Sequence, residues 1–93
     1  MQKVNPVKPE LIDLDKSRNT VSEFSNEMKQ KLIQKHFQGF RGWDSMPLKE
    51  ITDALVSHVM NLGRDYKPED AIDIANFAMF LWYNLKEADN VIS

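Results

Sequence analysis

The most apolar stretch of the chain runs from Ala71 to Leu85, and two polar residues, Asp73 and Asn76, lie inside it. A segment that is hydrophobic on nearly every side is typical of the central, buried helix of a small domain. An ionised carboxylate in such a helix is costly unless it is paired, hydrogen-bonded or bound to a metal. Spacing by three places Asp70, Asp73 and Asn76 along one helix face. This face therefore either lines a polar site or meets a partner helix through satisfied hydrogen bonds.

The residues near the start of the chain predict an arm and a first helix. Residues 1–19 contain Pro6 and Pro9 and show no sustained periodicity, which indicates an extended N-terminal arm. Thr20 and Glu23 then match a capping box, and apolar residues recur at helical spacing after them. The first helix is therefore expected over about Val21–His36.

Two more helices follow a glycine-containing loop. Pro47 suits the first position of the second helix, and Gly63 has the character of its stop signal. The third helix is expected over about Pro68–Glu87. No strand pattern and no internal repeat occurs in the sequence. The sequence therefore predicts an all-α fold, a helical hairpin or bundle of three main helices plus the arm, with residues 20–93 as one domain.

The third helix is too apolar for two short amphipathic partners to cover it. Trp82, which lies beside Phe80 and Tyr83, is the residue that most needs a neighbour from outside the chain. A helical hairpin can complete its core across a two-fold axis. We therefore expect a homo-oligomer, either a dimer or a tetramer.

Composition and charge narrow the classes of function. The 93 residues fit one domain with a modest core, and the formal net charge of −2 gives no general attraction to nucleic acids or anionic membranes. The absence of cysteine excludes disulfides and thiolate metal sites. The start lacks the apolar core of a signal peptide, and the Ala71–Leu85 stretch is too short to span a bilayer. The expected location is the cytoplasm, without a membrane as partner. A nucleic acid is disfavoured as a partner but not excluded, because a local basic patch is compatible with a small net charge.

The strongest candidate site joins the polar face of the third helix to the second helix. His58 and Asn61 are also three residues apart, so both can share one space between the helices with Asp70, Asp73 and Asn76. Oxygen ligands at this spacing suit Mg²⁺, whereas imidazole suits Zn²⁺ or Mn²⁺ better. The alternative is a set of structural hydrogen bonds in which Asp73 holds a buried His58. The residue types alone favour this structural alternative.

Two weaker candidates lie around the loop. Arg41, between Phe40 and Trp43, could stack a base and hold a phosphate, although Trp43 is better suited to plug the end of the helical core. A basic cluster could attract a triphosphate, although a solvated helix face explains it more simply; its members are Lys29, Lys31, Lys35, His36 and Arg41. The sequence has no phosphate-cradling glycine motif and no recognisable nucleophile.

The stretch from Phe24 to Leu85 resembles small phage-borne members of the MazG-like, all-α nucleoside triphosphate pyrophosphohydrolase superfamily. The resemblance rests on three segments: Phe24-x-x-x-Met28-x-x-Lys31-Leu32, Gly42-Trp43-Asp44 and, most specifically, Asp73-Ile74-Ala75-Asn76-Phe77-Ala78-Met79. It implies an oligomeric helical fold in which acidic residues from two facing helices hold Mg²⁺, with Mn²⁺ as the alternative. In that chemistry the metal organises a nucleoside triphosphate and activates a water, and attack on the α-phosphorus releases pyrophosphate.

Only one of the two acidic motifs of that superfamily is retained. Its Glu-x-x-Asp motif falls on Asp70-Ala71-Ile72-Asp73, and its Glu-x-x-Glu motif falls on His58-Val59-Met60-Asn61, where both carboxylates are missing. The expected metal ligands are Asp70 and Asp73, and the expected catalytic residues are these two and His58. The expected substrate-binding residues are Asn76, Asn61, Trp43, Arg41 and Lys35.

Three hypotheses about function follow from the sequence. The first is a metal-dependent nucleoside triphosphate pyrophosphohydrolase whose activity is weakened, altered or lost, in the host cytoplasm if the protein is phage-encoded. The second is a non-catalytic helical module that binds a nucleotide, or a host or phage protein. The third is a structural assembly subunit, in which Asp73 and Asn76 form hydrogen bonds across a helix interface.

Overall fold

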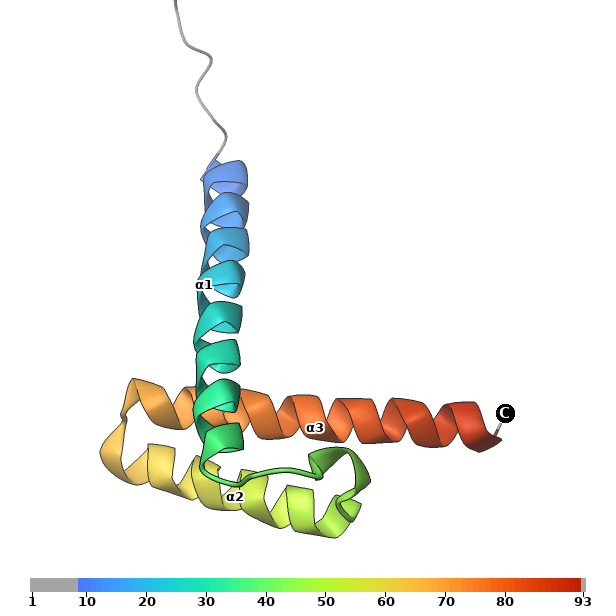
Figure 1. Cartoon of the computed structure of the whole chain (residues 1–93). Helices are drawn as coiled ribbons and strands as arrows, with labels where there is room; N and C mark the ends of the chain where they lie inside the picture. The colour runs from blue at the N-terminus through green and yellow to red at the C-terminus, as the bar shows by residue number, and fades with distance from the viewer. Residues whose placement is uncertain (1–8, 93) are drawn as a thin grey trace, which may run out of the picture.

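The chain folds into three α-helices and one short 3₁₀ turn (Figure 1). The computed structural model describes residues 9–92, and its elements are α1 over Pro9–Phe37, η1 over Trp43–Ser45, α2 over Leu48–Asp65 and α3 over Pro68–Ile92. No strand occurs within residues 9–92. The predicted all-α fold with three main helices is therefore confirmed. Within that range, no helix has the length and apolar character needed to cross a membrane.

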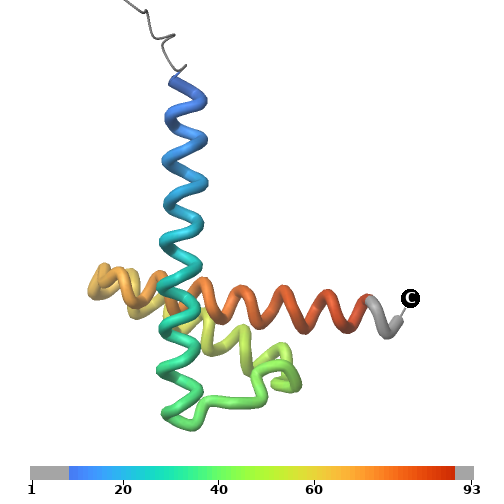
Figure 2. The backbone as a smooth tube through the Cα atoms, turned by 45° about the horizontal axis from the view of Figure 1, so that its top comes forward, coloured from blue at the N-terminus to red at the C-terminus, as the bar shows by residue number. Residues whose placement is uncertain are grey.

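α2 and α3 form an antiparallel hairpin, and α1 crosses it (Figures 1 and 2). α2 ends where Tyr66 adopts a left-handed conformation, with φ of 51°, and donates its backbone N–H to the carbonyl of Leu62 at 2.8 Å. Pro68 begins α3 two residues later, because its fixed φ suits the first turn of a helix. α3 packs against both α1 and α2 and is the central helix of the fold.

The core is small and lies where α3 meets the other elements. Ile51 and Phe80 are the buried apolar side chains of the described residues. The Trp43 ring stacks on the Phe80 ring with centroids 4.6 Å apart, and it meets the Tyr83 ring edge-on at 5.2 Å. Trp43 therefore packs against the end of the helical core, as the plug interpretation predicted.

Two glycines shape the connection between α1 and α2. Gly39 and Gly42 have φ values of 100° and 81°, a left-handed conformation that glycine adopts without steric cost. Phe40 lies between them, and its ring stacks on Phe80 at 5.9 Å and meets Phe77 at 6.0 Å. The loop thus returns the chain across the end of α1 and adds a second aromatic ring to the core.

The first helix begins earlier than the sequence predicts. The prediction of an extended arm is wrong for residues 9–19, because α1 already begins at Pro9; residues 1–8 of the predicted arm lie outside the described residues. The predicted capping box is also wrong, since Thr20 lies within α1 and its hydroxyl donates to the carbonyl of Lys16 at 2.7 Å. Pro9 misled the prediction because proline is tolerated in the first turn of a helix.

α2 and α3 also continue past their predicted ends. Gly63 does not stop α2, which continues to Asp65. α3 continues from the predicted Glu87 to Ile92. A helix can pass through an exposed glycine at a cost of about 1 kcal/mol relative to alanine, and Tyr66 provides the left-handed residue that the sequence analysis assigned to the glycine.

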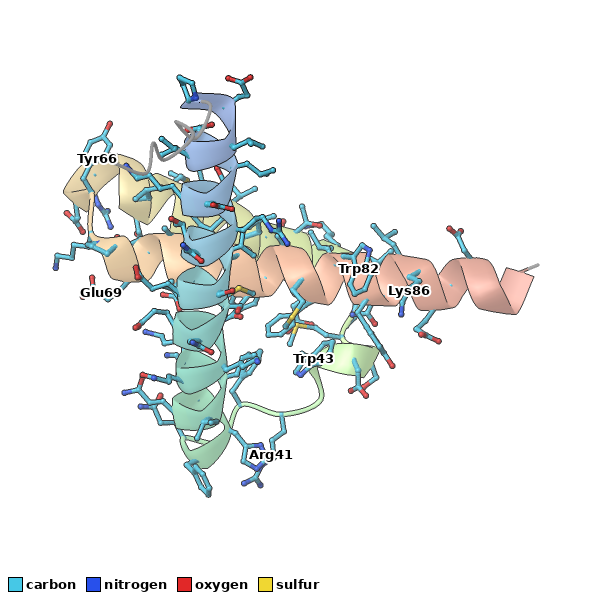
Figure 3. The ribbon with its side chains drawn as sticks, turned by 90° about the horizontal axis from the view of Figure 1, so that it is seen from above. Arg41, Trp43, Tyr66, Glu69, Trp82 and Lys86 are labelled. Atoms are coloured by element: carbon cyan, nitrogen blue, oxygen red, sulfur yellow. The ribbon has the colours of Figure 1, made fainter. Side chains whose placement is uncertain are left out.

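Many large apolar side chains stay uncovered in the single chain. Trp82 is 60% exposed on the outer side of α3, with the Lys86 ammonium 4.8 Å from its ring centroid (Figure 3). Other exposed apolar residues are spread over all three helices and include Leu11, Ile12, Leu14, Val21, Ile33, Phe37, Val56, Val59, Met60 and Leu85. Trp82 thus lacks cover from the residues that the structure describes, and self-association stays a prediction.

Candidate functional site

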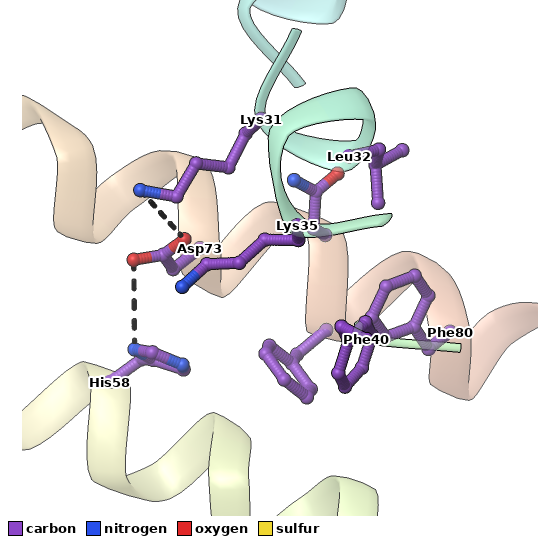
Figure 4. A pocket seen from close by; sticks show the side chains of 9 residues that line it. Lys31, Leu32, Lys35, Phe40, His58, Asp73 and Phe80 are labelled. Carbon is purple, nitrogen blue, oxygen red and sulfur yellow. Dashed lines mark ion pairs between the residues drawn. The ribbon is translucent and has the colours of Figure 1, made fainter. Parts of the chain in front are cut away.

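A pocket forms where α1, α2 and α3 meet (Figure 4). The space in it that water-sized molecules can reach is about 130 Å³, which is smaller than the roughly 300–1,000 Å³ of most small-molecule sites, so a ligand would extend out through its open mouth. Basic and polar side chains from all three helices surround an aromatic surface. The lining residues are Lys31, Leu32, Lys35, Phe40, His58, Asp73, Asn76, Phe77 and Phe80.

The carboxylate of Asp73 lies between two basic side chains. Lys31 Nζ is 3.7 Å from Asp73 Oδ1, and His58 Nδ1 is 3.8 Å from Asp73 Oδ2 (Figure 4). The Asp73 side chain is only 17% exposed, so water screens these contacts less than on an open surface. At this distance Lys31 and Asp73 interact through charge rather than through a short hydrogen bond, and His58 forms an ion pair with Asp73 only when its ring is protonated. Asp73 therefore links α3 to both α1 and α2.

Lys35 adds a further positive charge to the same pocket. It lies one helical turn after Lys31 on α1 and lines the pocket beside it (Figure 4). Within residues 9–89, no carboxylate pairs with Lys35. Two lysines and a histidine thus surround a single carboxylate, and the pocket favours an anion.

Asn76 provides a hydrogen-bond acceptor in the wall of the pocket. Its side chain is 4% exposed, and its Nδ2 donates to the carbonyl of Met28 at 3.4 Å. Its Oδ1 is buried and has no hydrogen-bond partner among the described residues. A buried acceptor without a partner is costly, so a ligand that offers an N–H or O–H donor to Oδ1 would relieve that cost.

The apolar surface of the pocket is a cluster of aromatic rings. Phe77 contacts the His58 ring with centroids 5.1 Å apart and meets Phe80 edge-on at 5.2 Å. Phe40 completes the cluster from the loop. Aromatic faces of this kind favour contact with another planar ring.

The structure separates two of the five residues that the sequence placed in one inter-helix space. Asp73, His58 and Asn76 line the pocket together, but Asp70 and Asn61 do not. The Oδ1 of Asn61 accepts a hydrogen bond from Arg64 Nη2 at 2.6 Å on the same helix. Asp70 lies in the first turn of α3, where its Oδ2 is buried without a hydrogen-bond partner in the described structure.

Neither loop residue of the expected substrate site lines the pocket. Trp43 is held in the core by its contacts with Phe80 and Tyr83. Arg41 is exposed at the outside of the loop and, with Trp43, lines a separate shallow groove beside Phe37 (Figure 3). Of the expected substrate-binding residues, the structure therefore brings only Lys35 and Asn76 to the pocket.

The donor set around Asp73 does not fit Mg²⁺. Within the described range, no three or more Asp, Glu or His side chains gather closely enough to hold a metal ion. Asp73 is the single carboxylate that lines the pocket, and its two oxygens face Lys31 and His58, whereas a divalent cation favours oxygen ligands that carry negative charge. Paired ligation by Asp70 and Asp73 stays a prediction from the sequence.

Sequence reasoning missed Lys31 and the aromatic cluster. Lys31 was grouped with basic residues of a solvated helix face, yet it lines the pocket and pairs with Asp73. One signal was present in the sequence: Lys31 and Lys35 are four residues apart and lie on the same face of the first helix as Met28. Spacing alone, however, does not say which element crosses that face.

No protein-family model, curated protein sequence or solved structure gives a significant match to the chain.

Proposed function

We propose that this chain is a non-catalytic helical module that binds a nucleotide-like ligand, a planar ring carrying phosphate, in the pocket between its three helices. The observation that carries the proposal is the pocket's composition. Lys31, Lys35 and His58 surround one carboxylate above an aromatic cluster. Such a pocket attracts an anionic group and also offers a surface for a flat ring.

The ligand would contact three parts of the pocket. Its phosphate would lie near Lys35, the pocket lysine that forms no ion pair in the described structure. Its ring would pack on the aromatic cluster, and an N–H at the ring edge would donate to Oδ1 of Asn76. The resemblance to the MazG-like superfamily independently supports a nucleotide as the ligand class.

The test is calorimetry on the purified chain with nucleoside mono- and triphosphates of each base, with and without Mg²⁺. We expect saturable one-to-one binding and no release of pyrophosphate. Lys35→Gln should weaken binding, and Lys29→Gln is the matched control, because Lys29 is exposed on the same helix and does not line the pocket. Absence of binding by every nucleotide would refute the proposal.

A metal-dependent pyrophosphohydrolase is the second candidate function. One observation favours it, namely the buried Asp70 Oδ2 that lacks a hydrogen-bond partner among the described residues. The same panel with Mg²⁺ or Mn²⁺ separates the two candidates. Steady release of pyrophosphate that Asp70→Asn abolishes would replace the binding proposal with an enzymatic one.

A further inference from the structure

The first half of α1 has no support from the other described residues (Figures 1 and 2). α1 has 29 residues, so it is about 43 Å long at 1.5 Å per residue. Every residue from Pro9 to Glu23 is exposed, and Phe24 is the first that is half-buried. A helix of about fifteen residues is marginal in water when nothing packs against it. This half of α1 therefore needs a neighbouring surface to stay helical.

The uncovered half of α1 continues the apolar face by which its second half packs. Leu14 and Val21 precede Met28 by fourteen and seven residues, so the three share one face of the helix. Met28 is half-buried, and its carbonyl accepts the hydrogen bond from Asn76 of α3. Leu14 and Val21 are 48% and 66% exposed. A face built for helix packing thus extends beyond the partner helix that the chain itself supplies.

We propose that Pro9–Glu23 of α1 pairs in antiparallel orientation with the same segment of a second copy of this chain, across a two-fold axis at the level of Lys16. Seam positions in this segment follow the heptad spacing of Leu11, Leu14, Arg18 and Val21. Antiparallel pairing sets Leu11 against Val21 of the second copy and Leu14 against Arg18 of the second copy. A two-fold contact of this kind needs one self-complementary surface.

The charges of the segment favour a second copy in antiparallel orientation. Glu10, Asp13 and Asp15 precede Lys16 and Arg18. In the antiparallel pair, residues 10–15 of one helix face residues 17–22 of the other, so Arg18 lies close to Asp15 of the second copy. A parallel pair would instead place each acidic residue beside its own counterpart, which is repulsive. This pairing is independent of the pocket and of any ligand in it.

The test compares two matched variants of the full chain by light scattering after size-exclusion chromatography and by circular dichroism across a dilution series. Leu14→Asp places a charge in the seam, and Ile12→Asp places the same charge on the opposite face, at a residue that is 57% exposed. We expect a dimer for the natural chain and for Ile12→Asp. For Leu14→Asp we expect the affinity of the dimer to fall by about tenfold or more. The helical signal should fall with it.

Cross-linking tests the orientation, because the chain contains no cysteine of its own. With a short bismaleimide, Ser17→Cys should form a covalent dimer, since Ser17 lies next to the axis. Leu11→Cys should not, because its two copies would lie about 15 Å apart along the helices.

Three outcomes would overturn the proposal. The first is a natural chain that stays monomeric at every concentration. The second is equal dissociation by the two aspartate variants. The third is a cross-linked Leu11→Cys dimer, which would indicate parallel pairing.

Discussion

Oδ2 of Asp73 on α3 lies 3.8 Å from Nδ1 of His58 on α2, and this contact spans the two helices of the hairpin. On its other side, Lys31 of α1 lies 3.7 Å from the second oxygen. Asp73 thus connects all three helices at one point. The same carboxylate also neutralises part of the positive charge that a phosphate would meet in the pocket.

This arrangement predicts an unusual effect of Asp73→Asn. If the pocket binds an anion, removal of the carboxylate should tighten phosphate binding by about fivefold. The reason is that the repulsion between carboxylate and phosphate, roughly 1 kcal/mol, is then absent. The fold should lose about 1 kcal/mol, since Lys31 loses its counter-charge at a partly exposed site. Calorimetry and urea denaturation measure the two effects.

Asp53→Asn is the control for this variant, because Asp53 pairs with Lys49 at 2.7 Å on the exposed side of α2. It should change neither ligand affinity nor stability by a measurable amount. Loss of nucleotide binding in Asp73→Asn would instead favour a cation held by that carboxylate.

Two asparagines on α3 should respond differently to replacement by leucine. Asn76 makes one long hydrogen bond and has a buried oxygen without a partner in the described structure, so Asn76→Leu should leave stability unchanged or slightly raised. Asn84 donates to the carbonyls of Trp43 at 3.1 Å and Phe80 at 2.8 Å, so Asn84→Leu should cost about 1 kcal/mol.

The two variants should rank in the opposite order when ligand affinity is measured instead of stability. Asn76→Leu should abolish binding because the acceptor for the ring edge is lost, whereas Asn84→Leu should bind normally once folded. Denaturation and calorimetry on both variants give the comparison. A strongly destabilised Asn76→Leu that still binds would show that the residue has a purely structural role.

The two tryptophans should contribute unequally to stability. Trp43→Ala removes a ring stacked on Phe80, and we expect a loss of about 2 kcal/mol, less than for a fully buried ring because Trp43 is only half-buried. Trp82→Ala removes a ring that is 60% exposed, and the free energy of unfolding should change by less than about 0.5 kcal/mol. Urea denaturation of dilute protein measures both, and equal losses would contradict the assignment of Trp43 to the core.

The sequence alone predicted the number of helices and the starts of α2 and α3 better than it predicted the helix lengths. Pro47 and Pro68 marked the starts of α2 and α3 to within one residue, because proline fixes φ and restricts the residue before it. Gly63 and Pro9 misled the prediction, since both residues are tolerated in helices when exposed or in the first turn. Local signals of this kind show where a helix can end, but not whether it does.

The site was predicted only in part, because spacing along one helix shows which residues share a face but not which other elements meet that face. The spacing on α3 placed Asp73 and Asn76 together, and both line the pocket. The structural alternative expected a hydrogen bond from Asp73 to a buried His58; the structure brings the two side chains to 3.8 Å without a hydrogen bond, and His58 is half-buried. Lys31 was missed because its partner lies 42 residues away on another helix. The periodicity of a helix does not predict which other helix crosses it. The aromatic cluster was missed because Phe40 reaches it from a loop.

Gly63 offers a direct test of the observed end of α2. It lies within the helix, and a Cβ added there would meet no atom within 4 Å. Gly63→Ala should therefore stabilise the fold by about 0.5–1 kcal/mol, because alanine is the better helix former and restricts the unfolded chain. Gly42 is the matched control: it also has open space around it, but its φ is 81°, so Gly42→Ala should destabilise by about 1 kcal/mol through backbone strain. Thermal denaturation of both variants decides the point, and a destabilised Gly63→Ala would mean that the glycine ends the helix after all.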